Sequence, residues 1–142
     1  MVGAIKHAQI TSVISRTLYS VTASTMAPAD IGHKVKELDQ QLNEWYRGLG
    51  SVYRARPTSK FIKMHPQKTV LHCLFFYFAY HGTLCRIHNV LATPWGRPAL
   101  QHTREEDYGT GIEESAAIVA EASRSLARAT QQLEINASSH VW

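Results

Sequence analysis

Apolar and aromatic residues run almost without a break through the middle of the chain. Between Val70 and Tyr80 the one residue of another kind is His72, and apolar residues continue at mixed spacing to Leu91. Polar residues interrupt this second half, among them His81, Arg86, His88 and Asn89. A helix that is apolar nearly all round is a buried core helix or a membrane span, and a span needs about 20 mostly apolar residues. We therefore predict a buried central helix over 67–91, with other helices packed around it.

Two amphipathic helices are predicted before the central one. Apolar residues at steps of three and four, the spacing of one helix face, define a helix over 4–22: Ile10, Val13, Ile14, Leu18 and Val21. The next helix, over 30–48, keeps these steps without a miss: Ile31, Val35, Leu38, Leu42, Trp45 and Leu49. We expect Asp30 to cap its start and Gly48 with Gly50 to end it. Its short seam suits packing within a bundle, and pairing with a partner helix stays open.

A last helix is predicted over 111–135. Thr110 and Glu113 have the spacing of a capping box, in which each side chain satisfies a free amide of the first turn. The expected buried seam again takes steps of three and four: Ile112, Ala116, Val119, Ser123, Leu126, Thr130 and Leu133. Small residues between Ala116 and Ser123 permit close approach to a bulky neighbour, and the aromatic central helix is the expected one.

The connections between these helices are read as loops. Residues 20–29 are small and polar, 51–67 contain Pro57 and Pro66 without a sustained period, and 97–111 are polar. Pro66 suits the first position of the central helix. The chain shows no strand pattern and no internal repeat, so the predicted fold class is all-α: an irregular bundle of about four main helices around a central apolar helix.

Composition agrees with a single globular domain. The chain has 142 residues, of which 44% are hydrophobic and 18% charged. Its two cysteines, Cys73 and Cys85, lie on the central helix, about 18 Å apart by helical rise, so they cannot pair with each other. Without a secretory signal, they indicate a reduced intracellular compartment.

The charge is unevenly placed. Residues 1–71 carry a net charge of +6 and residues 72–142 one of −2, and no acidic residue lies between Glu44 and Glu105. Six basic residues account for the excess: Arg47, Arg54, Arg56, Lys60, Lys63 and Lys68. Basic residues with aromatic ones between them suit nucleic acid. Because no nucleic-acid-binding motif frames this segment, we interpret it as a solvated loop.

Catalytic and metal-binding patterns are weak. His81, Cys85 and His88 stand at i, i+4 and i+7 on the central helix, groups that zinc favours, yet no paired CxxC or HExxH spacing accompanies them. Cys85 with a neighbouring histidine could form a nucleophile pair, but nothing supplies an orienting acid or an oxyanion hole. A glycine-rich phosphate loop, paired carboxylates and a nucleophile elbow are absent from the sequence. We predict a protein that is not an enzyme and has no resident metal or cofactor.

Four runs in these helices carry a recognisable pattern: Ile10–Ser20, the Leu-x-x-Trp-x-x-x-Leu run Leu42–Leu49, the central run Leu71–Tyr77 with Leu84–His88, and Ser115–Arg124. In this order they resemble the fungal-specific transcription factor domain, the middle homology region of binuclear zinc-cluster regulators. The sequence departs from the family pattern at several packing positions: Gly50 for the usual proline, Asn89 within the histidine-arginine-proline motif, Val119 for cysteine and Ser123 for alanine.

The resemblance implies an all-helical nuclear regulatory domain that modulates a transcription activator. It also implies a six-cysteine zinc cluster upstream as the DNA-binding part, and with two cysteines this chain does not contain it. Zinc and DNA are thus expected only through that other region. We expect 1–142 to be a single, incomplete regulatory domain, which leaves its central helix partly exposed.

The regulatory hypothesis needs a surface that binds a small-molecule effector or a coregulator. We select residues beside the central helix whose polar tips sit on apolar bodies: Tyr77, Tyr80, His81, Arg86 and His88. A homodimer is a further open possibility. The alternative functions are a membrane-associated helical protein and a small metal-binding helical bundle.

Overall fold

The computed structural model describes residues 2–93 and 111–137, and all regular structure in these two ranges is helical. The four long helices are α1 (Val2–Leu18), α2 (Pro28–Arg47), α4 (Gln67–Ala92) and α6 (Gly111–Ala137). The short elements are α3 (Ser59–Met64) and the 3₁₀ helices η1 (Thr22–Thr25) and η2 (Ser51–Arg54). The expected all-α bundle of about four main helices is confirmed.

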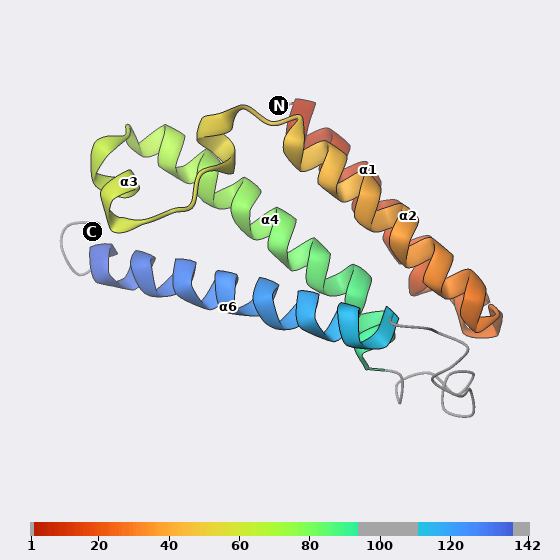
Figure 1. Ribbon diagram of the computed structural model, residues 1–142. Helices are drawn as coiled ribbons and strands as arrows, with labels where there is room; N and C mark the ends of the chain where they lie inside the picture. The colour runs from red at the N-terminus through yellow and green to blue at the C-terminus, as the bar shows by residue number, and fades with distance from the viewer. Residues whose placement is uncertain (1, 94–110, 138–142) are drawn as a thin grey trace.

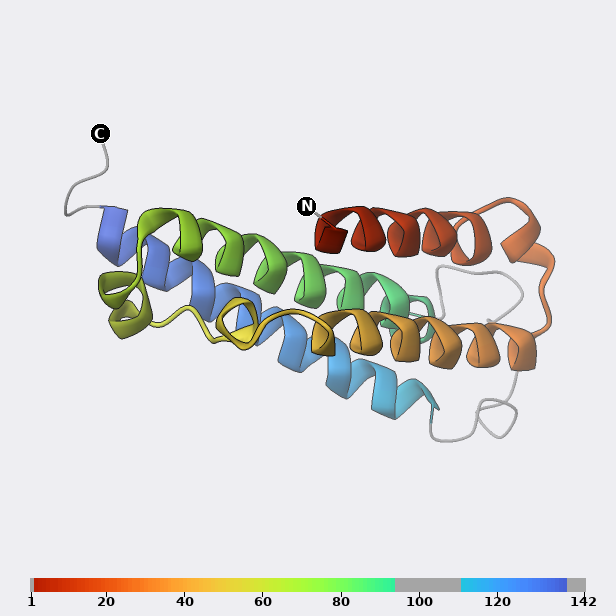
Figure 2. The same cartoon turned by 90° about the horizontal axis from the view of Figure 1, so that it is seen from above.

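Two antiparallel helix pairs build the bundle (Figure 1). In the same view the α1–α2 hairpin lies on one side of α4, and α6 runs back along the other side. Seen from above, α4 lies between α1 and α2 (Figure 2). α4 contacts α1, α2, α3, η2 and α6, which makes it the central helix. The position expected for the apolar run 67–91 is therefore correct, and α4 begins and ends within one residue of it.

The core lies between α1, α2 and the second half of α4. It contains ten buried residues: Ile14, Leu18, Ile31, Val35, Leu38, Leu42, Trp45, Ile87, Val90 and Leu91. Each large aliphatic side chain removed from water contributes about 1.5–3 kcal/mol. The indole N–H of Trp45 donates to the Gly3 carbonyl at 2.8 Å, so this buried donor is satisfied and ties α2 to the start of α1. The predicted seam of α2 is thus the centre of the core.

Two helix boundaries in the first hairpin differ from the sequence prediction. α1 ends at Leu18, because the Ala23 N–H bonds to the Ser20 carbonyl and hydroxyl and turns the chain into η1. Val21, expected in the seam, is consequently 89% exposed. α2 begins at Pro28, a favoured first helical residue. Asp30 lies in its first turn, where it suits the positive end of the helix dipole, and the N-cap is Ala27.

The loop expected over 51–67 contains η2 and α3. Thr58 caps α3, and its hydroxyl oxygen accepts a hydrogen bond from the Phe61 N–H at 3.2 Å. Because α3 is too short to show an apolar period, the sequence pattern did not reveal it. Pro66 caps α4 and is not its first residue. The predicted connection up to residue 110 and the capping role of Thr110 lie outside the described residues.

The buried face of α6 is rotated by one residue from the predicted seam. Its buried residues are Ser115, Ala122, Ser125 and Ala129, whereas Ala116, Ser123 and Thr130 are exposed. The expected neighbour, α4, is correct. The large apolar residues suggested the seam, but close approach to a bulky helix places the smallest side chains on the centre line and the larger ones at its flanks.

α4 is not buried all round. Leu71 is 57% exposed and Phe75 is 49% exposed, one turn apart on the same side of the helix. This matches the expectation of a partly exposed central helix. Within 2–93 and 111–137, no helix is long and apolar enough to cross a membrane.

Candidate functional site

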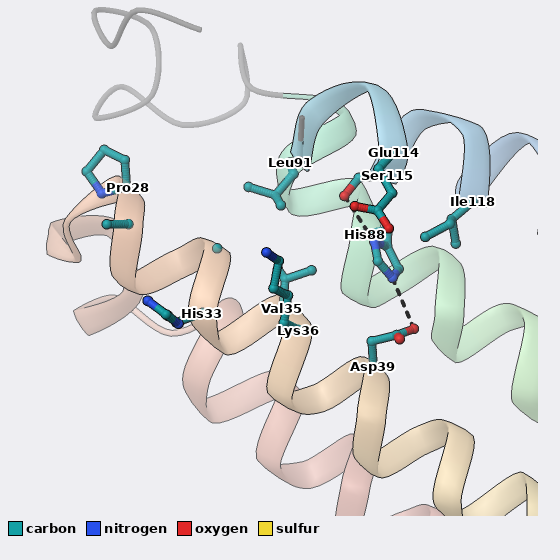
Figure 3. Close-up of a pocket in the computed structure, with 13 residues that line it drawn as sticks. Pro28, His33, Val35, Lys36, Asp39, His88, Leu91, Glu114, Ser115 and Ile118 are labelled. Atoms are coloured by element: carbon teal, nitrogen blue, oxygen red, sulfur yellow. Dashed lines mark hydrogen bonds and ion pairs between the residues drawn. The ribbon is translucent and has the colours of Figure 1, made fainter. Parts of the chain in front are cut away.

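A cavity of about 550 Å³ lies where α2, the last turns of α4 and the first turns of α6 meet (Figure 3). α2 contributes Gly32, Val35 and Asp39 to its walls, α4 contributes His88 and Leu91, and α6 contributes Ser115 and Ile118. Three further polar side chains line it: His33, Lys36 and Glu114. Apolar walls with a few convergent polar groups are typical of a small-molecule site. We call this cavity the three-helix pocket.

His88 is the centre of the pocket's polar contacts. The imidazole is 5% exposed, with Nδ1 3.0 Å from the Ser115 hydroxyl and Nε2 3.2 Å from the Asp39 carboxylate (Figure 3). A carboxylate at Asp39 selects the tautomer with the proton on Nε2. Nε2–H then donates to Asp39, and Nδ1 accepts from Ser115. One side chain therefore links three helices.

The hydrogen-bonded chain continues beyond Asp39. The Asn43 amide donates to the second oxygen of the Asp39 carboxylate at 3.0 Å, and the Tyr80 hydroxyl donates to the Asn43 side-chain oxygen at 2.7 Å. Ser115, His88, Asp39, Asn43 and Tyr80 thus form one continuous network. Buried polar networks whose members are satisfied hold the packing of their elements in one arrangement.

The tyrosines at the inner end of this network are held in the phenol form. Burial raises the pKa of Tyr80, and the nearby Asp39 carboxylate raises it further. Tyr46 stacks on the Tyr80 ring with centroids 4.0 Å apart. Burial and neighbouring groups raise the pKa of Tyr46 to about 12. Tyr80 therefore stays a hydrogen-bond donor to Asn43 at physiological pH.

The network contains the residue types of a hydrolase triad but not its arrangement. In a triad, the serine bonds Nε2 of the histidine and the carboxylate bonds Nδ1; here the two are exchanged. Ser115 is also only 2% exposed, so a substrate has little access to its hydroxyl. The arrangement suits the positioning of the three helices and the recognition of a bound molecule. The pocket offers donors and acceptors beside apolar walls.

The five residues selected from the sequence do not form one surface. Tyr80 and His88 belong to the network. Tyr77 and His81 lie together one turn away, with ring centroids 4.4 Å apart, and His81 Nδ1 is buried without a hydrogen-bond partner among the described residues. Arg86 lies toward α1, where it donates to the Ser15 hydroxyl at 3.2 Å and stands 5.7 Å from the centre of the Tyr19 ring.

The possible metal ligands have separate surroundings. Cys85 Sγ faces the Val119 carbonyl and the Ser123 hydroxyl on α6, at 3.9 and 3.7 Å, whereas His88 is held by Asp39 and Ser115. Across the part of the chain that the structure describes, no three His, Cys, Asp or Glu side chains are grouped to hold a metal ion. His81, Cys85 and His88 therefore share a helix but not a site.

Sequence reasoning missed three members of the network: Asp39, Asn43 and Ser115. Asp39 and Asn43 stand four residues apart, which puts them on one helix face. This spacing was the one available signal, and it is common on solvated helices. Ser115 had been noted only as part of the resemblance. Its meeting with His88 depends on how α6 packs against α4.

Two curated proteins share a distant likeness with the chain. Both are described as "ABC-transporter-regulating transcription factor", one from Aspergillus oryzae and one from Aspergillus fumigatus, and each is 28% identical over 85 residues. That stretch covers 60% of this chain and 9% of each relative, so the match spans less than a tenth of their length.

The other comparisons found nothing. No protein-family model matches the chain. No solved structure matches it. The two relatives indicate a distant likeness to fungal transcription regulators over these 85 residues.

Proposed function

We propose that this chain is the helical regulatory part of a fungal zinc-cluster transcription regulator and acts in the nucleus. The order of its sequence motifs, the all-α bundle and the two fungal relatives support this proposal. Cys73 and Cys85 are too few for a six-cysteine cluster. DNA contact through such a cluster is therefore not a property of these 142 residues, whose role is to modulate it.

The observation that carries the proposal is the three-helix pocket with His88 on its wall. A molecule bound there touches α2, α4 and α6 together, so its binding energy depends on how these helices are arranged. An effector or a coregulator side chain that bonds His88 or Asp39 changes the network between the helices. Such coupling is what a regulatory domain requires.

A tethered reporter assay tests this function. The chain is fused to a heterologous DNA-binding domain in a fungal cell, and reporter output is compared with that of the DNA-binding domain alone. We expect the fusion to change the output. The variant Gly32→Leu fills the pocket, because a Cβ added at Gly32 meets no heavy atom within 4 Å, and we expect it to reduce the change.

Gly82→Leu is the matched control. It makes the same substitution within a helix, also in open space, and Gly82 does not line the pocket. The proposal requires that this variant behave as the unaltered chain does. A fusion that leaves the reporter at the level of the DNA-binding domain alone would contradict the regulatory function. Equal effects of the two leucines would contradict the role of the pocket.

A further inference from the structure

A second cavity, of about 460 Å³, lies near the other end of α6, between that helix, α4 and the segment that leads into α3. Three cationic side chains line it: Arg56, Lys60 and Arg128. Among the described residues that line it, none is acidic. Ser115 and Ala129 stand fourteen residues apart on α6, so the two cavities are separated by about 20 Å of helix. We call this second cavity the cationic pocket.

The cationic groups have few acidic partners. Arg128 stands 4.0 Å from Glu121, at the limit of an ion pair, and the same carboxylate is held at 2.9 Å by Arg124. Arg56 and Lys60 make no ion pair with any residue in the described ranges. The Glu121 carboxylate interacts electrostatically with Arg56 and Arg128, but it is held by Arg124. The cations of the cavity outnumber this one carboxylate, so an anion there meets a net positive charge.

Beneath the cationic groups the cavity is apolar. Pro57 is fully buried, Ala129 is 4% exposed and Tyr77 is 5% exposed. The hydroxyl of Tyr77 makes no hydrogen bond to another residue that the structure describes, and it is not among the fully buried polar atoms. Because Tyr77 lines the cavity, this hydroxyl is a donor that a bound molecule can reach.

Ser59 anchors the basic segment to α6 beside the cationic pocket. The backbone N–H and the hydroxyl of Ser59 both donate to the side-chain oxygen of Gln132 on α6. Thr58 caps α3 next to this contact. Arg56 and Lys60 are thereby held opposite Arg128. Part of the basic segment that we expected to be a solvated loop is therefore one wall of a built cavity.

We propose that the cationic pocket binds a small organic anion with an apolar body. Guanidinium and ammonium groups bind the anionic head, and Pro57, Ala129 and the Tyr77 ring cover the body. A nucleic-acid backbone is the other anion to consider. It needs cations spread along an open face, whereas these three converge on a cavity of small-molecule size.

Titration of the unaltered full chain tests the class of ligand. The probes are 2-naphthoate, its neutral analogue 2-naphthamide and inorganic phosphate, followed by calorimetry and by the amide NMR signals around Tyr77 and Ala129. We expect naphthoate to bind and to move these signals. Because a charge-assisted hydrogen bond contributes about 1.5–3 kcal/mol, the amide should bind about tenfold or more weakly. Phosphate, which lacks an apolar body, should also bind more weakly than naphthoate.

A pair of double variants with equal net charge locates the site. Lys60→Gln with Arg128→Gln removes two cations of the cavity, and we expect it to weaken naphthoate binding at least tenfold. Lys63→Gln with Arg47→Gln removes two exposed cations that do not line the cavity, and binding should be unchanged. Circular dichroism and thermal unfolding confirm that both proteins keep the fold.

Three outcomes would overturn the proposal. Equal binding of naphthoate and naphthamide would show that the cations do not take part. Equal loss in the two double variants would show attraction by net charge alone. Binding of a short DNA duplex that depends on Lys60 and Arg128, without naphthoate binding, would assign these residues to a nucleic-acid surface.

Discussion

At the scale of single residues, three helical glycines differ in their surroundings. A Cβ added at Gly32 or Gly82 meets no heavy atom within 4 Å, whereas one at Gly3 lies 3.0 Å from Leu49 Cδ2 and 3.2 Å from Phe76 Cε1. At Gly32 and Gly82, glycine costs backbone conformational entropy on folding, although the structure has room for a larger side chain there. At Gly3 its small size is what lets α1 lie close to Leu49, which follows α2, and to Phe76 of α4.

Alanine substitution separates these roles. We expect Gly82→Ala to raise the free energy of unfolding by about 0.5–1 kcal/mol, because alanine is the better helix former. Gly3→Ala should lack this gain, since the added methyl group presses on Leu49 and Phe76. Urea unfolding measures both. Equal stabilisation by the two substitutions would contradict the close packing at the start of α1.

Two partly buried histidines make stability depend on pH. Burial lowers the pKa of His7 and of His81 below the ordinary value of 6.5. The Arg86 charge also lowers that of His7, while Glu121 partly opposes the shift at His81. In the window between the lowered and ordinary pKa values the unfolded chain binds more protons, so the free energy of unfolding rises with pH.

We therefore expect this contribution to be complete above pH 6.5 and to be lost as the pH falls through the lowered pKa values. Urea unfolding at a series of pH values from neutral to mildly acidic measures it. His7→Gln and His81→Gln should each flatten the dependence, and exposed His72→Gln should leave it unchanged. If the double variant His7→Gln/His81→Gln keeps the same slope of unfolding free energy against pH, other groups cause the pH dependence.

At the scale of elements, the contact between α4 and α6 shows how helix faces are chosen. Apolar periodicity favoured a seam through Ala116, but Ala122 and Ala129 are the residues buried against α4. Small side chains on the centre line let the helices approach, and the half-buried Val119 and Leu126 pack at the flanks.

Leucine substitutions distinguish the two faces. Ala122→Leu places a large side chain into a 1% exposed position and should destabilise the fold by about 1–3 kcal/mol through overpacking. Ala116→Leu, on the exposed face, should change stability by less than about 0.5 kcal/mol. Thermal or chemical unfolding of both variants gives the comparison. A larger loss of stability in Ala116→Leu than in Ala122→Leu would support the buried seam that the sequence pattern predicted.

At the scale of the whole molecule, the exposed apolar row of α4 is the surface through which we expect copies of the chain to associate. Leu71 and Phe75 are each about half exposed and lie one turn apart, and neighbouring exposed apolar side chains favour association. We expect the double variant Leu71→Gln/Phe75→Gln to shift the sedimentation of concentrated protein toward the monomer. Its folded stability should change little.

Val21→Gln is the control for this row. Val21 is 89% exposed and follows the end of α1, whereas Leu71 and Phe75 belong to the first half of α4. The end of α1 and the start of α4 lie at opposite ends of the bundle (Figure 1). We expect its sedimentation to match that of the unaltered chain. Self-association that is insensitive to the double substitution, or equally sensitive to Val21→Gln, would show that the α4 row is not its surface.

The sequence by itself determined the four long helices and the central position of α4. Steps of three and four place apolar residues on one helix face, and in α2 every apolar residue from Ile31 to Trp45 is buried as this rule requires. A helix apolar nearly all round needs neighbours on several sides. These properties depend on residues close in sequence or on total apolar area, and both can be read along the chain.

Only the tertiary structure decided the sites. His88 was visible as a polar tip on an apolar helix, but its partners Asp39 and Ser115 come from two other helices, 49 and 27 residues away. Arg56, Lys60 and Arg128 are likewise brought together by the contact of Ser59 with Gln132, 73 residues apart. Helical periodicity gives the direction of a side chain around its own axis. The rotation and register between packed helices come from side-chain fit across the interface, and that fit is what creates both pockets.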